Sequence, residues 1–335
     1  MNAVHHPISK ASSFKWLLKR EFWENRGGFL WAPLVAGAIS LLLTAFAIGA
    51  GLMAIRKASA NHEFEIDGFS VNGMDLGLLV REMTPERAAE LARALDMTLF
   101  LSGTWPFLVL AFVAFFYCLG ALYDERRDRS VLFWKSLPLS DTQTVLSKAV
   151  SALVVAPLLA VVAAILTMFG FLLMISVVVL AHGGNPVTLV WGPASPLLIA
   201  AGLLSWIPVY ALWALPTAGW LLFCSAWARS KPFLWAVTVP VFAGVIVHWF
   251  DLMRLFGLPA SWFWTHIVGR LLLGTFPGAD LPFRGGSASV RSALQDISPM
   301  SQLNALAMPE LWIGVVVGVA LLVAAVYMRR HRDEA

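Results

Sequence analysis

Charged residues are scarce in this chain of 335 residues. Asp, Glu, Lys and Arg together make up 13% of it, whereas hydrophobic residues make up 59%. A soluble domain carries roughly a quarter charged residues, so about half that share excludes a globular protein that solvates its own surface. The chain is therefore expected to lie in a membrane.

Cysteine and tyrosine are rare as well. The 2 cysteines, Cys118 and Cys224, lie far apart within apolar runs, which excludes a disulfide framework and a cysteine metal site. We interpret them as small buried apolar residues. The chain has only 4 Tyr but 15 Trp and 22 Phe, and many of the Trp flank apolar runs. Aromatic rings favour the boundary between bilayer and water, which again indicates an integral membrane protein.

Motifs for nucleotide binding and for catalysis are also missing. The sequence contains no GxxxxGK[ST], no HExxH and no GxSxG. We therefore expect no enzyme activity, no cofactor and no metal in this chain, and no nucleic acid as a partner. If ATP drives the protein, ATP and Mg must be bound by another chain.

Long apolar runs are what the sequence does contain. About 20 apolar residues cross the hydrocarbon as an α-helix, and six segments reach this length. The predicted fold is therefore all-α, a single transmembrane domain over residues 1–335. The predicted spans are residues 29–54, 98–122, 149–181, 196–226, 233–250 and 309–328.

The remaining segments are expected to flank the membrane. Within residues 1–28, apolar positions at helical spacing predict an amphipathic helix at Ser13–Asn25, either lying on the membrane or simply orienting the first span. Residues 55–97 and 251–308 are predicted outside, and Pro85 suggests a helix start in the first of them. In the second, Ser261–Phe276 is apolar but short, which favours a re-entrant or interfacial helix over a seventh span.

Basic residues predict the orientation of the spans. Six spans place both termini on one side, and that side then holds fifteen of the 24 Lys and Arg residues. Positively charged loops stay in the cytoplasm. Both termini and the loop of residues 123–148 are therefore predicted to be cytoplasmic.

This loop carries the densest charge in the chain. All residues from Asp124 to Arg129 are charged, and an apolar group follows at Val131–Trp134. One interpretation is a solvated loop that obeys the positive-inside rule. The other is a docking surface, because an apolar group outside the membrane needs a partner or the lipid surface. Ser140 and Gln143 have the spacing of a capping box, which predicts that the third long helix begins at Ser140.

The same residues resemble a known family. Glu125-Arg126, Ser130-Val131, Ser136, Pro138-Leu139-Ser140 and Val145-Leu146 with Lys148 are similar to the first cytoplasmic loop of ABC-2 type ABC-transporter permeases. The predicted layout, with an amphipathic N-terminal helix and six spans, agrees with this resemblance. The sequence departs from the common pattern where Arg129-Ser130 replaces a Gly-Thr pair.

The resemblance implies that the loop is a coupling helix docking on a separate ABC ATPase subunit. It also implies a permease in a bacterial inner membrane, usually an exporter, in which two copies, or one copy with a related permease, pair with two ATPases. The expected contact residues are Asp124, Glu125, Arg126, Arg127, Asp128, Arg129, Val131, Leu132, Phe133, Trp134, Ser136 and Pro138. The scarcity of charge within the spans favours an apolar or amphipathic cargo.

A second set of ionisable residues lies near the outer end of the fifth span, where charge at membrane depth suggests a function. These candidates for an outer gate or substrate path are His248, Asp251, Arg254, His266 and Arg270. The outer interface, with Asp251 and Arg254 paired on one helical face, explains the same residues without a substrate.

Two other functions remain open at this point. A gradient-driven secondary transporter or channel would place ionisable residues within the spans. A membrane-embedded enzyme would need a catalytic cluster at one depth. An ATP requirement or a stable ATPase partner would distinguish an ATP-driven transporter from the gradient-driven transporter and from the enzyme.

Overall fold

The computed structural model describes residues 10–60, 65–66, 69–70, 84–130, 139–253, 259–279 and 299–331. Within these residues the chain is almost entirely helical, and six helices are long and apolar enough to cross a membrane. The protein is thus an all-α, multi-pass membrane protein, as the apolar runs predicted.

The helices and strands follow one another along the chain, with π-helical turns labelled η. In order they are α1 (Lys10–Glu24), η1 (Gly27–Trp31), α2 (Ala32–Ala60), β1 (Glu65–Ile66), β2 (Phe69–Ser70), α4 (Pro85–Ser102), α5 (Thr104–Gly120), α6 (Tyr123–Arg127), α8 (Asp141–Val150), η2 (Ser151–Val155), α9 (Ala156–Ala181), η3 (Val187–Trp191), α10 (Pro196–Trp227), α11 (Pro232–Leu252), α12 (Ala260–Phe263), η4 (Trp264–Gly269), α13 (Arg270–Leu273), α15 (Pro299–Ala305) and α16 (Pro309–His331). β1 and β2 form a short antiparallel pair.

Two of the spanning helices are longer than the apolar runs within them. The helical stretch that contains the second span covers Pro85–Arg127, and the third covers Asp141–Ala181. About 20 residues cross the hydrocarbon, so both stretches project beyond it. The helix expected at Pro85 is present: Thr84 is its N-cap and accepts a hydrogen bond from the Arg87 amide at 3.4 Å.

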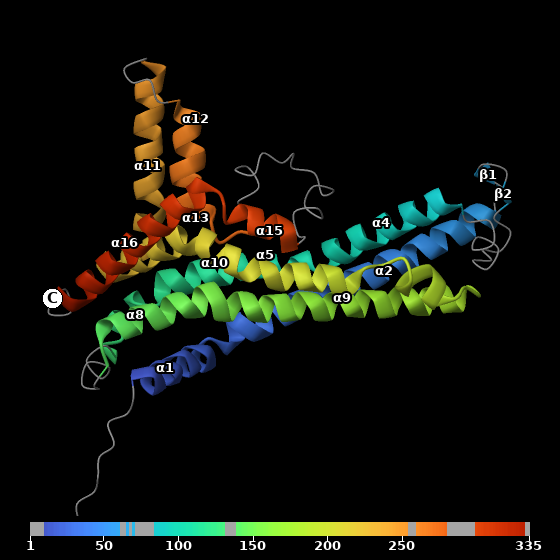
Figure 1. The fold of residues 1–335 in the computed structure, drawn as a ribbon, viewed down its shortest axis with the longest axis horizontal. Helices are drawn as coiled ribbons and strands as arrows, with labels where there is room; N and C mark the ends of the chain where they lie inside the picture. Colours follow the sequence, from blue (N-terminus) through green and yellow to red (C-terminus); the bar gives the residue numbers. More distant parts are fainter. Residues whose placement is uncertain are drawn as a thin grey trace, which may run out of the picture.

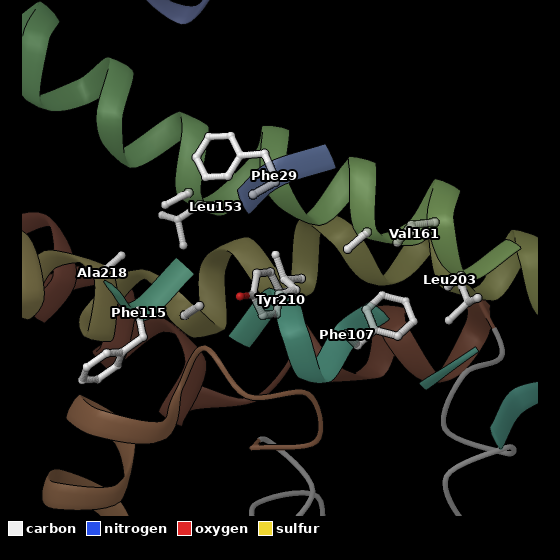
Figure 2. Close-up of a cluster of buried hydrophobic side chains, with 14 of the residues drawn as sticks. Phe29, Phe107, Phe115, Leu153, Val161, Leu203, Tyr210 and Ala218 are labelled. Atoms are coloured by element: carbon white, nitrogen blue, oxygen red, sulfur yellow. The ribbon is translucent and has the colours of Figure 1, made fainter. Parts of the chain in front are cut away.

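The long helices lie side by side along one axis. In Figure 1, α2, α5, α9 and α10 run along the long axis of the molecule, and α4 continues beside α2. Their buried side chains meet between the helices, as Figure 2 shows. The labelled members of this core are Phe29, Phe107, Phe115, Leu153, Val161, Leu203, Tyr210 and Ala218.

Glycines allow α10 and α16 to approach closely. A Cβ atom on Gly219 would lie 2.7 Å from the carbonyl oxygen of Gly318, and one on Gly318 would lie 2.8 Å from the carbonyl carbon of Leu215. Small residues give membrane helices this kind of backbone contact. The packing fixes the path of α16, whose last turn carries Arg329.

A helical hairpin stands across the bundle. In Figure 1, α11 and α12 form an upright pair at an angle to the long helices. Asp251, near the end of α11, accepts a hydrogen bond from the Ala260 amide at the start of α12, at 3.0 Å. Within the predicted segment Ser261–Phe276, the chain is helical as far as Leu273 through α12, η4 and α13.

The predicted amphipathic helix is present as α1, and one of its faces is turned to the protein. Leu17 and Glu21 are buried, whereas Trp16 and Trp23 are more than half exposed. α1 packs against α8. The face of α1 that is turned to the protein therefore includes a carboxylate.

Candidate functional site

The short helix α6 is fastened to the end of α10. The amides of Leu122 and Tyr123 both donate to Ser225 Oγ, at 3.0 and 2.9 Å. The guanidinium of Arg126 donates to the carbonyl oxygens of Ser225 and Ala228, at 2.6 and 2.9 Å. The last carbonyls of a helix lack partners within it and carry partial negative charge. Arg126 thus satisfies the C-terminal end of α10.

Glu125 points from α6 into the protein and is only 7% exposed. Its Oε1 atom lies 2.9 Å from Lys148 Nζ and 3.1 Å from Arg20 Nη2. Its Oε2 atom accepts a hydrogen bond from Arg329 Nη1 at 2.8 Å. Three cations from three other helices therefore converge on one carboxylate.

Glu21 of α1 is a second buried carboxylate beside the first, and it is 1% exposed. Its Oε1 atom accepts a hydrogen bond from Lys148 Nζ at 3.0 Å, and its Oε2 atom accepts one from the Tyr117 hydroxyl at 2.7 Å. Lys148 lies between Glu21 and Glu125 and is itself 3% exposed. The ammonium group therefore joins α1, α6 and α8.

The capping box at the start of α8 positions two members of this group. The Gln143 amide donates to Ser140 Oγ at 3.2 Å, and the Ser140 amide donates to Gln143 Oε1 at 3.4 Å, as the spacing predicted. Asp141 and Lys148 are seven residues apart, which places them on one helical face. Asp141 Oδ1 accepts a hydrogen bond from Arg329 Nε at 3.2 Å.

We call this set the ion-pair cluster. It joins α1, α6, α8 and α16 through Arg20, Glu21, Glu125, Asp141, Lys148 and Arg329. Because both α1 and the end of α16 take part, the first and the last described helix meet at one end of the molecule, which we call the terminus-bearing end.

Opposite charges make this burial tolerable. Burial acts to lower the pKa of the Arg20 guanidinium, but the hydrogen bond to Glu24 and the charges of Glu21, Glu24 and Glu125 raise that pKa above its ordinary value. A buried ion whose partner is removed costs about 3–5 kcal/mol. The cluster therefore holds its four helices in one arrangement.

The other face of α6 is open. Asp124, Arg127, Asp128 and Arg129 are exposed. Arg129, two residues after the end of α6, has a left-handed backbone with φ of 56°. The loop thus has two acidic and two basic side chains on its surface.

The structure places the described residues of the predicted ATPase contact in two groups. Asp124, Arg127, Asp128 and Arg129 are exposed, whereas Glu125 and Arg126 are engaged inside the protein with Lys148, Arg329 and the end of α10. The remaining predicted contacts lie outside the described residues; these are Val131, Leu132, Phe133, Trp134, Ser136 and Pro138.

The four described residues predicted for an outer gate lie on three elements, α11, η4 and α13. His248 is exposed on α11, and Asp251 accepts the Ala260 amide. His266 stacks on Trp262 with the ring centroids 4.9 Å apart. Arg254 lies outside the described residues.

Arg270 holds two helices together. Its guanidinium lies 4.2 Å from the ring centroid of Trp213 in α10 and donates to the carbonyl of Glu310 in the first turn of α16. Its own carbonyl accepts from the Thr217 hydroxyl at 2.6 Å. These contacts explain Arg270 as a packing residue of α10, α13 and α16.

Comparison with protein-family models, curated proteins and solved structures finds no match. The chemistry of the site therefore rests on its own geometry. Within the described ranges, no three His, Cys, Asp or Glu residues gather as metal ligands would. Carboxylates whose oxygens are already bound to cationic side chains hold helices together and do not act as acids, bases or ligands.

Glu21, Lys148 and Arg329 were not singled out by sequence reasoning as a site. Glu21 had a recognisable signal, because it follows Phe14, Leu17 and Leu18 at helical spacing and so interrupts an apolar stripe with a charge. Arg329 was interpreted only as part of the positive-inside pattern.

Proposed function

We propose that this chain is the membrane-spanning permease subunit of an ATP-driven ABC transporter, with a separate ATPase subunit docking at the loop that contains α6. The loop sequence resembles that of ABC-2 type permeases. The observation that carries the proposal is the two-sided character of α6. Its inner face is bound to α1, α8, α10 and α16 through Glu125 and Arg126, while four charged side chains of the same loop are exposed.

This arrangement suits the transmission of movement. A partner that pulls or pushes on the exposed charges acts on a helix that cannot shift independently, because Glu125 ties it to Lys148 and Arg329. Mixed charges on a docking surface fix the register of the partner and steer its approach. ATP hydrolysis in the partner would then move α8 and α16 together with α6.

The location and direction follow from the same proposal. The terminus-bearing end faces the cytoplasm of a bacterial inner membrane, because it carries most of the basic residues. Two copies, or this chain and a related permease, pair with two ATPases. The cargo is an apolar or amphipathic molecule moved outward, which suits spans that are poor in charge.

The test is co-purification. The tagged chain is extracted from its native host in a mild detergent, and we expect an ATP-hydrolysing subunit to accompany it in equal amount. A variant with Arg127→Ala, Asp128→Ala and Arg129→Ala should lose that subunit without a change in melting temperature. Arg330→Ala removes an exposed cation at the same end but not on α6, and this control should retain the subunit.

The opposite result would be a chain that purifies alone and transports without ATP. The exposed charges would then lie in water and serve only to orient the spans in the membrane. The gradient-driven transporter would replace the present proposal.

A further inference from the structure

A groove lies on the outside of the bundle at the terminus-bearing end. It runs between the end of α5, α6 and the start of α11, and its volume is about 490 Å³. Its lining includes Phe116, Leu119, Asp124, Lys231, Phe233 and Leu234. The groove is separate from the ion-pair cluster, because Glu125 points to the other side of α6 and into the protein.

The walls of the groove are apolar and open. Phe116 and Phe233 stack across it with ring centroids 6.2 Å apart and planes inclined by 22°. They are 56% and 46% exposed, and Leu234 is 52% exposed. These side chains belong to the ends of two spanning helices, where the hydrocarbon begins. An acyl chain is the apolar material available at this depth.

Two opposite charges stand at the same groove. Asp124 of α6 and Lys231 at the start of α11 both line it, and both are exposed. Neither forms an ion pair with another described residue. The groove thus offers one site for a cation and one for an anion above a single apolar wall.

We propose that the groove binds a phospholipid with a primary-ammonium headgroup, phosphatidylethanolamine, from the leaflet at the terminus-bearing end. The ammonium group binds Asp124, the phosphate binds Lys231, and an acyl chain lies against Phe116 and Phe233. A choline headgroup has no N–H to donate to the carboxylate, and a glycerol headgroup has no positive charge to offer it. The inference needs only the membrane; of the four exposed charges of the loop it uses Asp124 alone, which the variant in the co-purification test leaves unchanged.

The backbone conformation of Lys231 supports a ligand site, and it allows a substitution that should not disturb the fold. Lys231 has a left-handed conformation with φ of 47°, which is unfavourable for any residue with a Cβ atom. Strained residues gather at functional sites, where the surrounding structure holds them. Lys231→Gly removes the ammonium group and relieves the backbone, so the fold should be retained while the phosphate contact is lost.

The experiment measures lipid binding to the full chain in a mild detergent by native mass spectrometry. Phosphatidylethanolamine, phosphatidylcholine and phosphatidylglycerol with identical acyl chains are titrated separately. We expect phosphatidylethanolamine to bind at least about threefold more tightly than the other two, as exposed ion pairs allow. Asp124→Asn should reduce it to the phosphatidylcholine level. Lys231→Gly should weaken the binding of all three lipids, because each of them carries the phosphate, and neither variant should lower the melting temperature.

Arg229→Gln is the matched control, because Arg229 is an exposed cation two residues from Lys231 that does not line the groove. It should leave the affinities for all three lipids unchanged. Equal affinities for the three lipids, tighter binding of phosphatidylglycerol, or an equal loss in Arg229→Gln and Lys231→Gly would each overturn the assignment. These outcomes are decided without the ATPase, so they do not depend on the result of the co-purification.

Discussion

The terminus-bearing end and helix α11 are attached to the bundle by different forces. At the first, Glu21 and Glu125 are buried and neutralised by cations from neighbouring helices. α11 is attached by ring contacts of Phe233, edge-on with Phe115 and stacked with Phe116, and by a hydrogen bond from Trp220 to the Ala236 carbonyl at 3.0 Å. No ion pair joins α11 to another described element.

The difference shows which helices are held in one relative position and which can change their neighbours. A buried ion pair is costly to break and exacting in geometry, so the helices at the terminus-bearing end keep one relative position. Apolar contacts have little direction, so α11 can exchange protein neighbours for lipid at low cost. We infer that force applied at α6 is transmitted through the cluster and not through α11.

The largest effect is expected when the shared cation is removed. Lys148→Met keeps the length of the side chain but leaves Glu21 and Glu125 buried without their common partner. The free energy of unfolding should fall by about 3–5 kcal/mol. Thermal unfolding followed by tryptophan fluorescence would measure the loss.

Lys15→Met is the control for this variant, because Lys15 is an exposed lysine of α1. Its effect should stay within about 0.5 kcal/mol. If the two lysine variants melted at the same temperature, the cluster would not be holding its helices together.

A near-zero effect is expected on α11. Phe242 is 62% exposed on this helix, so Phe242→Ala removes a ring that faces lipid. The free energy of unfolding should change by no more than about 0.5 kcal/mol. Phe29→Ala is the matched variant in the bundle, where the ring is 1% exposed, and it should cost about 3–5 kcal/mol. Similar losses in the two variants would show that α11 has a protein partner on that face.

Local signals predicted the elements of the fold. The lengths of the apolar runs identified six spanning helices, and Pro85 marked the start of α4. The Ser140 capping box marked the start of α8 in the same way. Each of these signals lies within a few residues of its consequence, so the sequence is sufficient to find it.

The inner face of α6 could not be predicted in that way. Residues 124–129 mix both signs of charge, and nothing local distinguishes Glu125 from Asp128. The distinction comes from Arg329, which is 204 residues further along the chain. It depends on how α16 packs against α10, where Gly219 and Gly318 bring the backbones together. Distant packing of this kind leaves no pattern in the loop itself.

The most direct test of the account compares two carboxylates of the same loop. Glu125→Gln and Asp128→Asn each replace a carboxylate by an amide of the same shape, one in the cluster and one on the exposed face. Melting temperatures of the two variants and the native chain are measured in one detergent. The account predicts a large decrease for Glu125→Gln and none for Asp128→Asn. Equal melting temperatures for the two variants would contradict it.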